Sequence, residues 1–239
     1  MNNPILLLTF NCLELTKKCV ESVLDQNILI DLMIIDNGST DGTVEWISNH
    51  YGISHVFINN SNTGVSAAWN MGLKYWFDTA DAEHVLVLNN DTIIPTWFYR
   101  KLLSYLDPFV TGIEVDQMNQ IATIPFPCPP VPHPDFSAFL IRKEAWKRIG
   151  KFDESMKLYS SDQDYHLRGW FEGVRMSKVN VPYYHERSST LKHSNPAARL
   201  ELESQANADR AELRRKWGVS AGGEDYQKLF SAENFGKLK

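Results

Sequence analysis

The sequence predicts an α/β fold: a Rossmann-like, mostly parallel central sheet flanked by helices, with a smaller region after it. Short unbroken apolar runs, such as residues 85–88, are typical of strands buried on both faces. These runs alternate with segments whose apolar residues recur at helical spacing, which implies right-handed βαβ units. With 239 residues, 43% of them hydrophobic and 22% charged, the chain can build the substantial core of an ordinary globular protein.

The first hundred residues repeat the strand–helix pattern. Strands are expected at residues 4–9, 29–35, 55–58 and 85–88. Helices are expected between these strands: one that ends at about residue 25, one around Val44 and Ile47, and one that starts at Gly64. A further helix should follow Pro95, because proline is well placed in a first turn.

The regular pattern breaks after Asp107. Six prolines fall within residues 125–134, and this density excludes helix and central strand. Residues 108–135 are therefore expected to form one extended loop. After it we expect strands at 136–142 and 179–184, short helices at 143–149 and 161–171, and a charged helix at 195–216. The last 20 or so residues are expected to be poorly ordered.

Composition narrows the class of protein. The net charge of −5 gives no support to tight non-specific binding of nucleic acid. Three cysteines are too few for a disulfide framework, and Cys12 and Cys19 would stand roughly 10 Å apart along one helix. We expect no signal peptide and no transmembrane segment, because residues 1–9 lack a basic region and no apolar run approaches about 20 residues. We therefore expect a reduced, cytoplasmic protein that meets any membrane-bound substrate from the cytoplasmic side.

Two of the expected buried strands end in polar clusters. Asn89, Asn90 and Asp91 follow one strand, and Asp36 opens a polar turn after another. Open α/β sheets bind ligands in the crevice at the carboxyl ends of their strands. The clusters therefore predict a site for a polyhydroxylated, phosphorylated ligand and a divalent cation, which points to an enzyme.

Five segments stand out along the chain: Leu7–Cys19, Ile34–Thr43, Asn62–Gly72, Leu88–Asp91, and Gly150–Glu154 with Ser161–Tyr165. Each motif is weak alone, but together they span roughly residues 4–190. In this order they resemble the inverting glycosyltransferase family 2, which has the GT-A fold. The fourth segment occupies the place of that family's metal-binding DxD motif.

The resemblance implies a single GT-A domain over residues 1–220, followed by a tail at 221–239. Residues 1–107 would form the nucleotide-sugar-binding half, and 108–193 the acceptor-binding, catalytic half. Residues 194–220 would form a C-terminal helix. We expect that helix and the proline-rich loop to shape the acceptor site.

The resemblance also implies nucleotide contacts from the first two strands. Asp36 would accept hydrogen bonds from the base or the ribose, with Thr9 and Asn11 lining the same pocket. The residues alone leave an alternative open: Asp36 starts a sequence rich in turn formers and could be a turn or cap residue.

Asn62 and Asn70 surround the start of the helix after Gly64. Glycine allows close backbone approach, and free N–H groups at a helix start favour anions. We favour nucleotide-sugar contacts from both asparagines, although Gly64 could simply relieve a turn.

A divalent cation, Mn²⁺ or Mg²⁺, is expected at Asp91. Hard cations prefer oxygen ligands, and a diphosphate supplies two, so one protein carboxylate can suffice. The metal would stabilise negative charge on the leaving nucleoside diphosphate. Asn89 stands where DxD has its first acidic residue, and its amide could hydrogen-bond a ribose hydroxyl. We assign Asn90 to the same donor site. The alternative for Asp91 is a helix cap ahead of Pro95.

His185 is predicted to be the second ligand of the metal or the diphosphate. The family commonly places a histidine after a late strand, and His185 follows residues 179–184. A lone histidine is more often a core or surface residue, and His193 is a competing candidate.

Asp162 is the predicted general base, aligned with the second residue of the family's Glu-Asp motif. An inverting transfer needs a base to deprotonate the acceptor hydroxyl. Ser161 replaces the family's glutamate. Acidic residues are also favoured at a helix start for structural reasons, and Asp164 with Arg168 would form an i,i+4 pair.

These assignments predict a metal-dependent, inverting transfer of one sugar from a nucleoside diphosphate sugar, with UDP favoured. The acceptor hydroxyl could belong to a glycan, a lipid-linked sugar, a protein or a modified DNA base. The Gln-x-x-Arg-Trp motif of processive members is absent from the sequence, which favours single-sugar addition.

Two alternatives remain open at this stage. Asn89 and Ser161 lack the expected acidic groups, so the chain could be a non-catalytic nucleotide- or sugar-binding module. A nucleotidyltransferase would instead need a glycine-rich phosphate loop with a basic residue after the first strand, where residues 9–13 read Thr-Phe-Asn-Cys-Leu.

Overall fold

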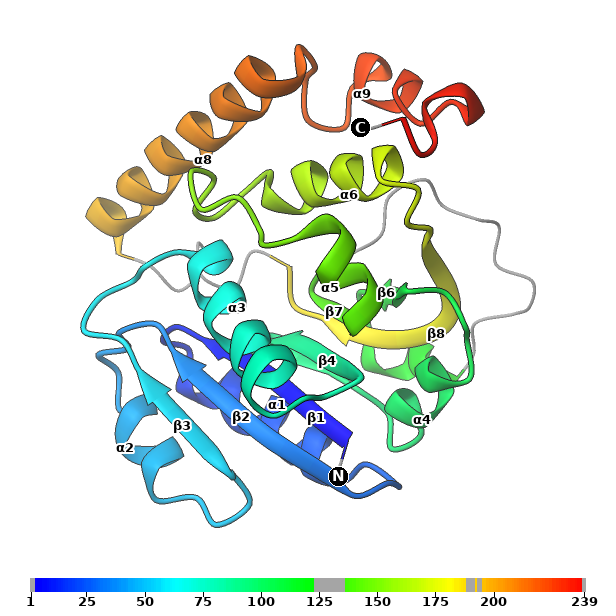
Figure 1. Cartoon of the computed structure of the whole chain (residues 1–239). Coiled ribbons are helices and arrows are strands. Elements are labelled where there is room, and N and C mark those ends of the chain that lie inside the picture. Colours follow the sequence, from blue (N-terminus) through cyan, green and yellow to red (C-terminus); the bar gives the residue numbers. More distant parts are fainter. Residues whose placement is uncertain (1–2, 123–135, 188–191, 193–194, 238–239) are drawn as a thin grey trace.

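The computed structural model describes residues 3–122, 136–187, 192 and 195–237. These residues build an eight-stranded sheet with the order β3-β2-β1-β4-β7-β6-β8-β5 (Figure 1). The strands are β1 (Asn3–Thr9), β2 (Ile30–Asp36), β3 (His55–Ile58), β4 (His84–Asn89), β5 (Thr92–Ile93), β6 (Phe109–Val115), β7 (Ala138–Arg142) and β8 (Met176–His185).

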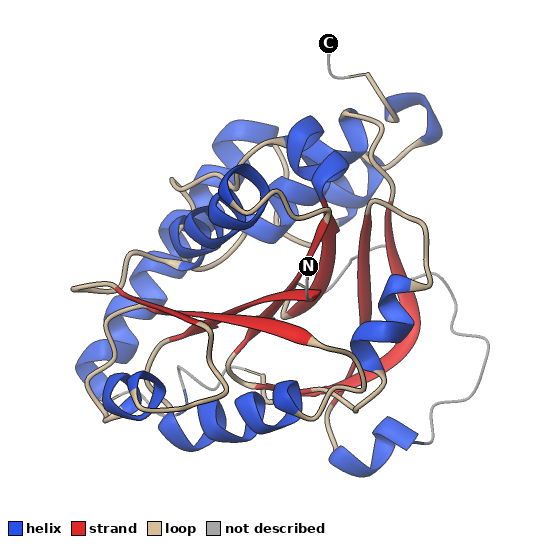
Figure 2. Cartoon of the chain, turned by 60° about the horizontal axis from the view of Figure 1, so that its bottom comes forward, coloured by secondary structure: helices blue, strands red, loops and turns tan. Residues whose placement is uncertain are grey.

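Helices cover both faces of the sheet, as Figure 2 shows. One face packs against α3, its π-helical continuation η1, and α5, and the other packs against α1, α2 and α4. The bounds are α1 (Leu13–Leu24), α2 (Thr43–Ser48), α3 (Val65–Lys74), η1 (Tyr75–Thr79), α4 (Phe98–Leu103), η2 (Met118–Ala122), α5 (Lys143–Ile149), α6 (Ser161–Phe171), α8 (Pro196–Trp217), α9 (Glu224–Lys228) and η3 (Ala232–Asn234). This is the α/β layering that the alternation predicted.

The four strands β3, β2, β1 and β4 are parallel. Leu6 and Leu7 point to opposite faces, and both are fully buried in separate clusters. Burying such a side chain stabilises the fold by about 1.5–3 kcal/mol, which explains the unbroken apolar runs. Because the strands run in one direction, their carboxyl ends meet at one edge. There Thr9 pairs with Asp36, and Leu8 pairs with Asn89.

The prediction that residues 108–135 form one loop is wrong in its first part. Phe109–Val115 is strand β6, antiparallel to β7 and parallel to β8. The sequence pattern concealed it because Gly112 interrupts the strand where the register shifts, and a Cβ at Gly112 would lie 2.4 Å from the carbonyl oxygen of Val181. Partners distant in sequence therefore hold β6. The six clustered prolines and Cys128 lie outside the described residues.

The C-terminal region is more ordered than the sequence indicated. Helix α8 is capped by Asn195, whose side chain accepts a hydrogen bond from the Ala198 N–H, and by Gly218, which has a left-handed conformation. Helix α9 follows and packs on α6, where Leu167 and Tyr226 are fully buried. Residues 224–234 are therefore part of the folded body, because their aromatic side chains complete a small third core.

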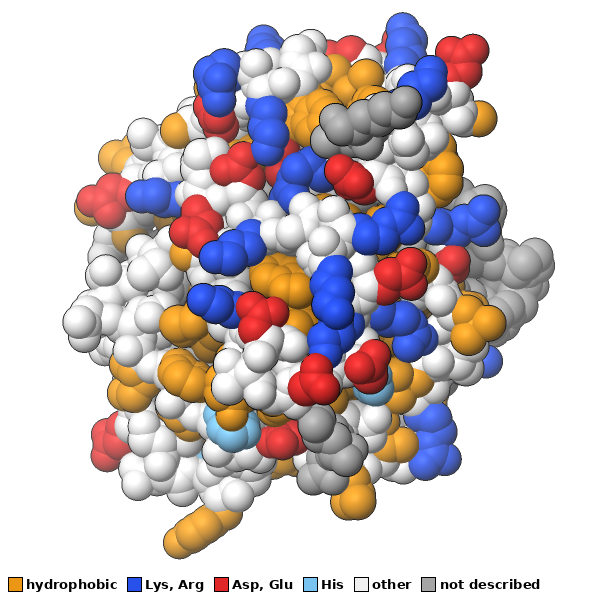
Figure 3. All heavy atoms as spheres, in the orientation of Figure 1, with side chains coloured by type: hydrophobic (Ala, Val, Ile, Leu, Met, Phe, Trp, Pro, Cys, Tyr) orange, Lys and Arg blue, Asp and Glu red, His pale blue; other side chains and the backbone are white. Residues whose placement is uncertain are grey.

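The face seen in Figure 3 carries acidic and basic side chains interspersed. Cys12 and Cys19 are both free thiols, as their predicted separation required. No helix within residues 3–122, 136–187 and 195–237 combines the length and apolar composition needed to cross a lipid bilayer.

Candidate active site

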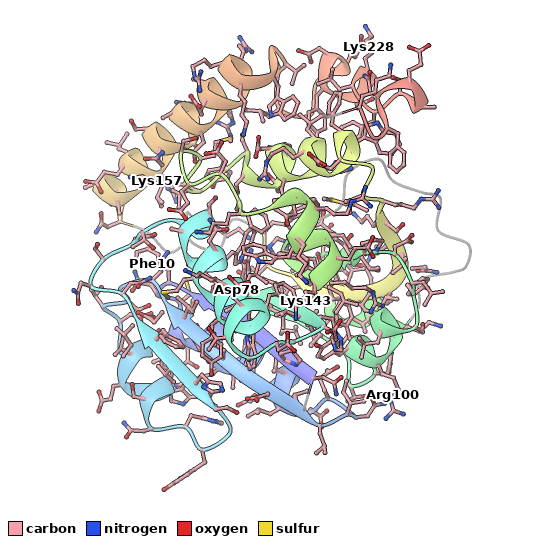
Figure 4. The ribbon with its side chains drawn as sticks, viewed as in Figure 1. Phe10, Asp78, Arg100, Lys143, Lys157 and Lys228 are labelled. Carbon is pink, nitrogen blue, oxygen red and sulfur yellow. The ribbon has the colours of Figure 1, made fainter. Side chains whose placement is uncertain are left out.

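A cavity of about 820 Å³ opens at the carboxyl edge of the parallel strands. Loops after β1, β2 and β3 form one side, and α8 with the loop before α6 forms the other. Figure 4 labels Phe10 and Lys157, which line the cavity from these two sides. The remaining lining residues are Asn11, Cys12, Leu13, Glu14, Leu15, Thr40, Asp41, Asn62, Gly64, Leu158, Asn195, Ala198, Glu201, Leu202 and Gln205.

Asp36 and Thr9 come together beneath this cavity and do not line it. Asp36 is fully buried, and its carboxylate accepts hydrogen bonds from the N–H groups of Gly38 and Ser39 at 3.0 and 2.8 Å. The Ser39 hydroxyl donates to its second oxygen at 2.5 Å. The Thr9 hydroxyl lies 3.0 Å from that of Thr16. In this structure Asp36 holds the turn after β2, which is the role that the turn-forming sequence left open.

Asn11 and Asn62 do face the cavity. Asn11 has a positive φ of 54°, and its side-chain oxygen accepts a hydrogen bond from the Thr40 N–H at 2.8 Å. The Asn62 side-chain oxygen accepts from the Gly64 N–H at 2.9 Å. Both asparagines thus shape cavity loops with their oxygens while lining the space.

Position 64 requires glycine because the loop before α6 lies close to its backbone. Its φ is +91°, and a Cβ there would lie 2.8 Å from the carbonyl oxygen of Lys157. The Val65 N–H donates to that same carbonyl at 2.6 Å. The start of α3 therefore binds the backbone of the loop before α6.

Asn70 and Asn90 use their amides within the protein. The Asn70 amide donates to the Phe152 carbonyl at 2.9 Å and to Glu154 at 2.8 Å, and its oxygen accepts from the Phe152 N–H at 2.8 Å. The Asn90 amide donates to the Thr9 hydroxyl at 3.1 Å and to the Asn11 carbonyl at 3.0 Å. Asn70 thus joins α3 to the segment after α5, and Asn90 joins the ends of β4 and β1.

Asp91 and His185, predicted as metal ligands, are brought together. The pairing of β5 with β8 sets Thr92 opposite His185, and the Glu186 N–H donates to the Asp91 carbonyl at 2.9 Å. The His185 Nε2 then lies 3.5 Å from the Asp91 Oδ1. The two side chains are only 16% and 12% exposed. His193, the competing candidate, lies outside the described residues.

The chemistry of this pair fits a divalent cation. A carboxylate oxygen and an imidazole nitrogen are both ligands that Mn²⁺ accepts, and Mg²⁺ is commonly held by one or two carboxylates plus substrate phosphates. The described residues contain no group of three or more His, Cys, Asp or Glu side chains that could hold a metal ion. A cation held by this pair alone would keep positions open for diphosphate oxygens.

The surrounding charge favours a cation. The Cys12 thiol is half-buried, and its pKa is raised to about 11, first by burial and then by the carboxylates of Asp41, Asp91 and Glu186. Asn89, at the end of β4, has a buried side-chain oxygen for which the described part of the chain provides no hydrogen-bond donor. The site thus combines negative potential with an acceptor suited to a ligand hydroxyl.

Asp162 and Asp164 have different environments on α6. Asp164 is fully buried and binds Arg168 at 2.8 Å and Lys216 at 2.7 Å, so the expected i,i+4 pair forms. Asp162 is partly exposed, and burial raises the pKa of its carboxyl above the ordinary value. A raised pKa suits proton transfer near neutral pH.

Comparison with known proteins decides the family. A family model described as Glycosyl transferase family 2 matches residues 5–166, more than half of the chain. The chain belongs to glycosyl transferase family 2. This confirms the resemblance drawn from the five motifs.

Two relatives of this family 2 protein are similar over most of its length. A low-salt glycan biosynthesis hexosyltransferase, Agl10, of Haloferax volcanii is 26% identical over 63% of this chain and 57% of its own. Chondroitin synthase of Escherichia coli is 25% identical over 77% of this chain and 29% of its own. The chain therefore spans less than two thirds of either relative.

Solved structures confirm the GT-A fold. The mannosyltransferase PcManGT of Pyrobaculum calidifontis, in complex with GDP-Man and Mn²⁺, has a TM-score of 0.64 at 16% identity, over 99% of this chain and 70% of its own. Residues 1–349 of S. aureus TarS, in complex with UDP-GlcNAc, have a TM-score of 0.63 at 14% identity, over 98% of this chain and 77% of that fragment.

Sequence reasoning missed two carboxylates of this family 2 protein. Glu114, on the unexpected strand β6, lies 3.1 Å from the His185 Nδ1. Asp209 of α8 is fully buried and accepts hydrogen bonds from the backbone N–H groups of residues 157, 158 and 159 at 2.8–3.1 Å. No motif marks either residue, because each gains its role from a partner 50 or more residues away in sequence.

Proposed function

We propose that this chain transfers a single sugar from a nucleoside diphosphate sugar to an acceptor hydroxyl, with inversion and with Mn²⁺ or Mg²⁺. The observation that carries the proposal is the 3.5 Å approach of Asp91 to His185 at the carboxyl edge of the sheet. UDP is the favoured nucleotide. TarS, crystallised with UDP-GlcNAc, supports the choice of UDP. PcManGT, crystallised with GDP-Man and Mn²⁺, supports a nucleotide-sugar donor with a divalent cation.

In this proposal the donor nucleoside occupies the 820 Å³ cavity. Asn11 and Asn62 contact it directly, because both line the space. The buried oxygen of Asn89 accepts a hydrogen bond from a ribose hydroxyl. Thr9, Asp36, Asn70 and Asn90 support the loops that form the site, in keeping with their internal hydrogen bonds.

Asp91 and His185 hold the cation, which when bound offsets the negative charge on the departing diphosphate. The acceptor oxygen forms a bond to the anomeric carbon from the side opposite the diphosphate. The bond from that carbon to the phosphate oxygen breaks, and its electron pair leaves with the nucleoside diphosphate. The proton of the acceptor hydroxyl passes to the Asp162 carboxylate.

The test uses the purified chain with Mn²⁺ and a panel of UDP-, GDP- and dTDP-sugars. Release of nucleoside diphosphate reports both transfer to an added acceptor mixture and slow donor hydrolysis. Asp162→Asn should abolish transfer while thermal-shift binding of the donor persists, since a bound ligand raises apparent stability. Glu172→Gln, just beyond the far end of α6, is the matched control and should retain activity.

Asp91→Ala should remove the metal dependence of donor binding. Intact metal-dependent transfer in Asp91→Ala would contradict the central assignment. If the unmodified chain binds donors but shows neither transfer nor hydrolysis, it is a binding module on a GT-A scaffold.

A further inference from the structure

We propose that Glu114 is a positioning residue for the metal site: it fixes the His185 ring so that Nε2 faces Asp91 and the cation. The inference rests on the proposed function, in which Asp91 and His185 bind the metal. Glu114 belongs to none of the motifs that identified the site, and it lies on a strand that the sequence pattern did not reveal.

The hydrogen bond between Glu114 and His185 determines which ring nitrogen carries the proton. The His185 Nδ1 lies 3.1 Å from the Glu114 Oε2. An ionised carboxylate can only accept a hydrogen bond, so Nδ1 must be the protonated nitrogen in this contact. In the neutral ring, Nε2 then presents its lone pair toward Asp91, 3.5 Å away. A metal-binding imidazole needs this tautomer.

The strand pairing makes the arrangement rigid. β6 and β8 run parallel, with Glu114 opposite Tyr183, two residues before His185. The Glu114 and His185 side chains are 18% and 16% exposed, so water competes little for their hydrogen bond. Positions on paired strands hold a ligand more precisely than positions on loops.

A simpler explanation is that Glu114 only pairs with Arg187. The structure separates the two contacts, because Arg187 binds Oε1 whereas His185 binds Oε2. Arg187 also lies 3.7 Å from Asp116, a residue that is 74% exposed and next to the end of β6. Asp116→Asn therefore removes an acidic partner of Arg187 while leaving the contact between Glu114 and His185 intact.

The first experiment measures the affinity of Mn²⁺ for the full chain in the presence of UDP, by electron paramagnetic resonance. Loss of a partner behind a metal-binding histidine weakens metal binding by about 10- to 100-fold, and we expect this for Glu114→Ala. Glu114→Gln keeps an oxygen that can accept the Nδ1 hydrogen bond, so it should recover most of the affinity. Asp116→Asn should match the unmodified chain. Equal affinities for Glu114→Ala and the unmodified chain would overturn the inference.

The second experiment needs no variant that alters Glu114. Nitrogen-15 NMR of histidine-labelled, metal-free protein reads the tautomer of the ring, and His185→Ala assigns its signals. At a pH at which the ring is neutral, a proton on Nδ1 supports the inference, and a proton on Nε2 overturns it. If the unmodified chain binds no Mn²⁺ with UDP, the proposed metal dependence fails, while the NMR result still judges the role of Glu114.

Discussion

Asp209 offers the sharpest test of how α8 contributes to the donor cavity. Its Oδ2 accepts hydrogen bonds from the N–H groups of Leu158 and Tyr159 at 2.8 and 2.9 Å. Its Oδ1 accepts from the Lys157 N–H at 3.1 Å and from Gln205 at 2.7 Å. Asp209 is fully buried, so water cannot replace these bonds. The carboxylate therefore fixes the loop that carries two cavity-lining residues.

Asp209→Asn keeps the shape of the side chain but turns one acceptor into a donor. Whichever way the amide faces, two hydrogen bonds are lost and two N–H groups meet another donor. Hydrogen bonds to charged groups contribute about 1.5–3 kcal/mol each, so we expect a loss of about 3–6 kcal/mol in the free energy of unfolding. For a chain of this size that lowers Tm by roughly 6–24 °C.

Thermal and urea unfolding measure this loss, and steady-state kinetics with a UDP-sugar measure its effect on the cavity. KM for the donor should rise several-fold in Asp209→Asn, because Lys157 and Leu158 line the cavity. Glu203→Gln, an exposed change on the same helix, should leave stability and KM unchanged. If Asp209→Asn stays within about 0.5 kcal/mol of the unmodified chain, the size of a neutral surface change, the reasoning is wrong.

Two further predictions follow from the site. A general base must be ionised, and burial raises the pKa of Asp162, so kcat/KM should fall on the acid side with a midpoint above that of an ordinary aspartate. A pH–rate profile with its midpoint at or below the ordinary value would contradict this. Gly64→Ala should lower the free energy of unfolding by about 1–3 kcal/mol, because a Cβ would meet the Lys157 carbonyl and φ is +91°. Urea unfolding measures this loss. Gly222→Ala is the control: Gly222 has a positive φ but open space around it, so this variant separates backbone strain from the steric contact.

Much of the parallel half of the sheet could be predicted because its signals are local. Residues 5–8, 32–35 and 85–88 are apolar without interruption, and each lies in a strand buried on both faces. Strand β6 gave no such signal, because its stability comes from β7 and β8 on either side. The expected disorder of the last residues failed for the same reason, since Tyr226 is held by contacts with α6.

The site residues also divide into features that the sequence could predict and features that only the structure revealed. Asp91, Asp162 and His185 were named from motifs, and the structure brings Asp91 and His185 together as predicted ligands require. For Asp36, the sequence left two roles open; the hydrogen bonds from Gly38 and Ser39 show that it holds the turn, and its contact with the nucleotide stays a prediction. The residue types identified a polar cluster, but only the fold showed which polar atoms already have hydrogen-bond partners within the protein.

The sequence by itself determined the family, the alternation of strands and helices, and the chemical types gathered at the carboxyl edge of the sheet. These properties depend on residue order and local periodicity. Tertiary structure decided that Glu114 supports His185, that Asp209 binds the loop before α6, and that α8 walls the cavity. Those contacts join residues 50 or more positions apart, and their hydrogen bonds exist only once the sheet and α8 have packed.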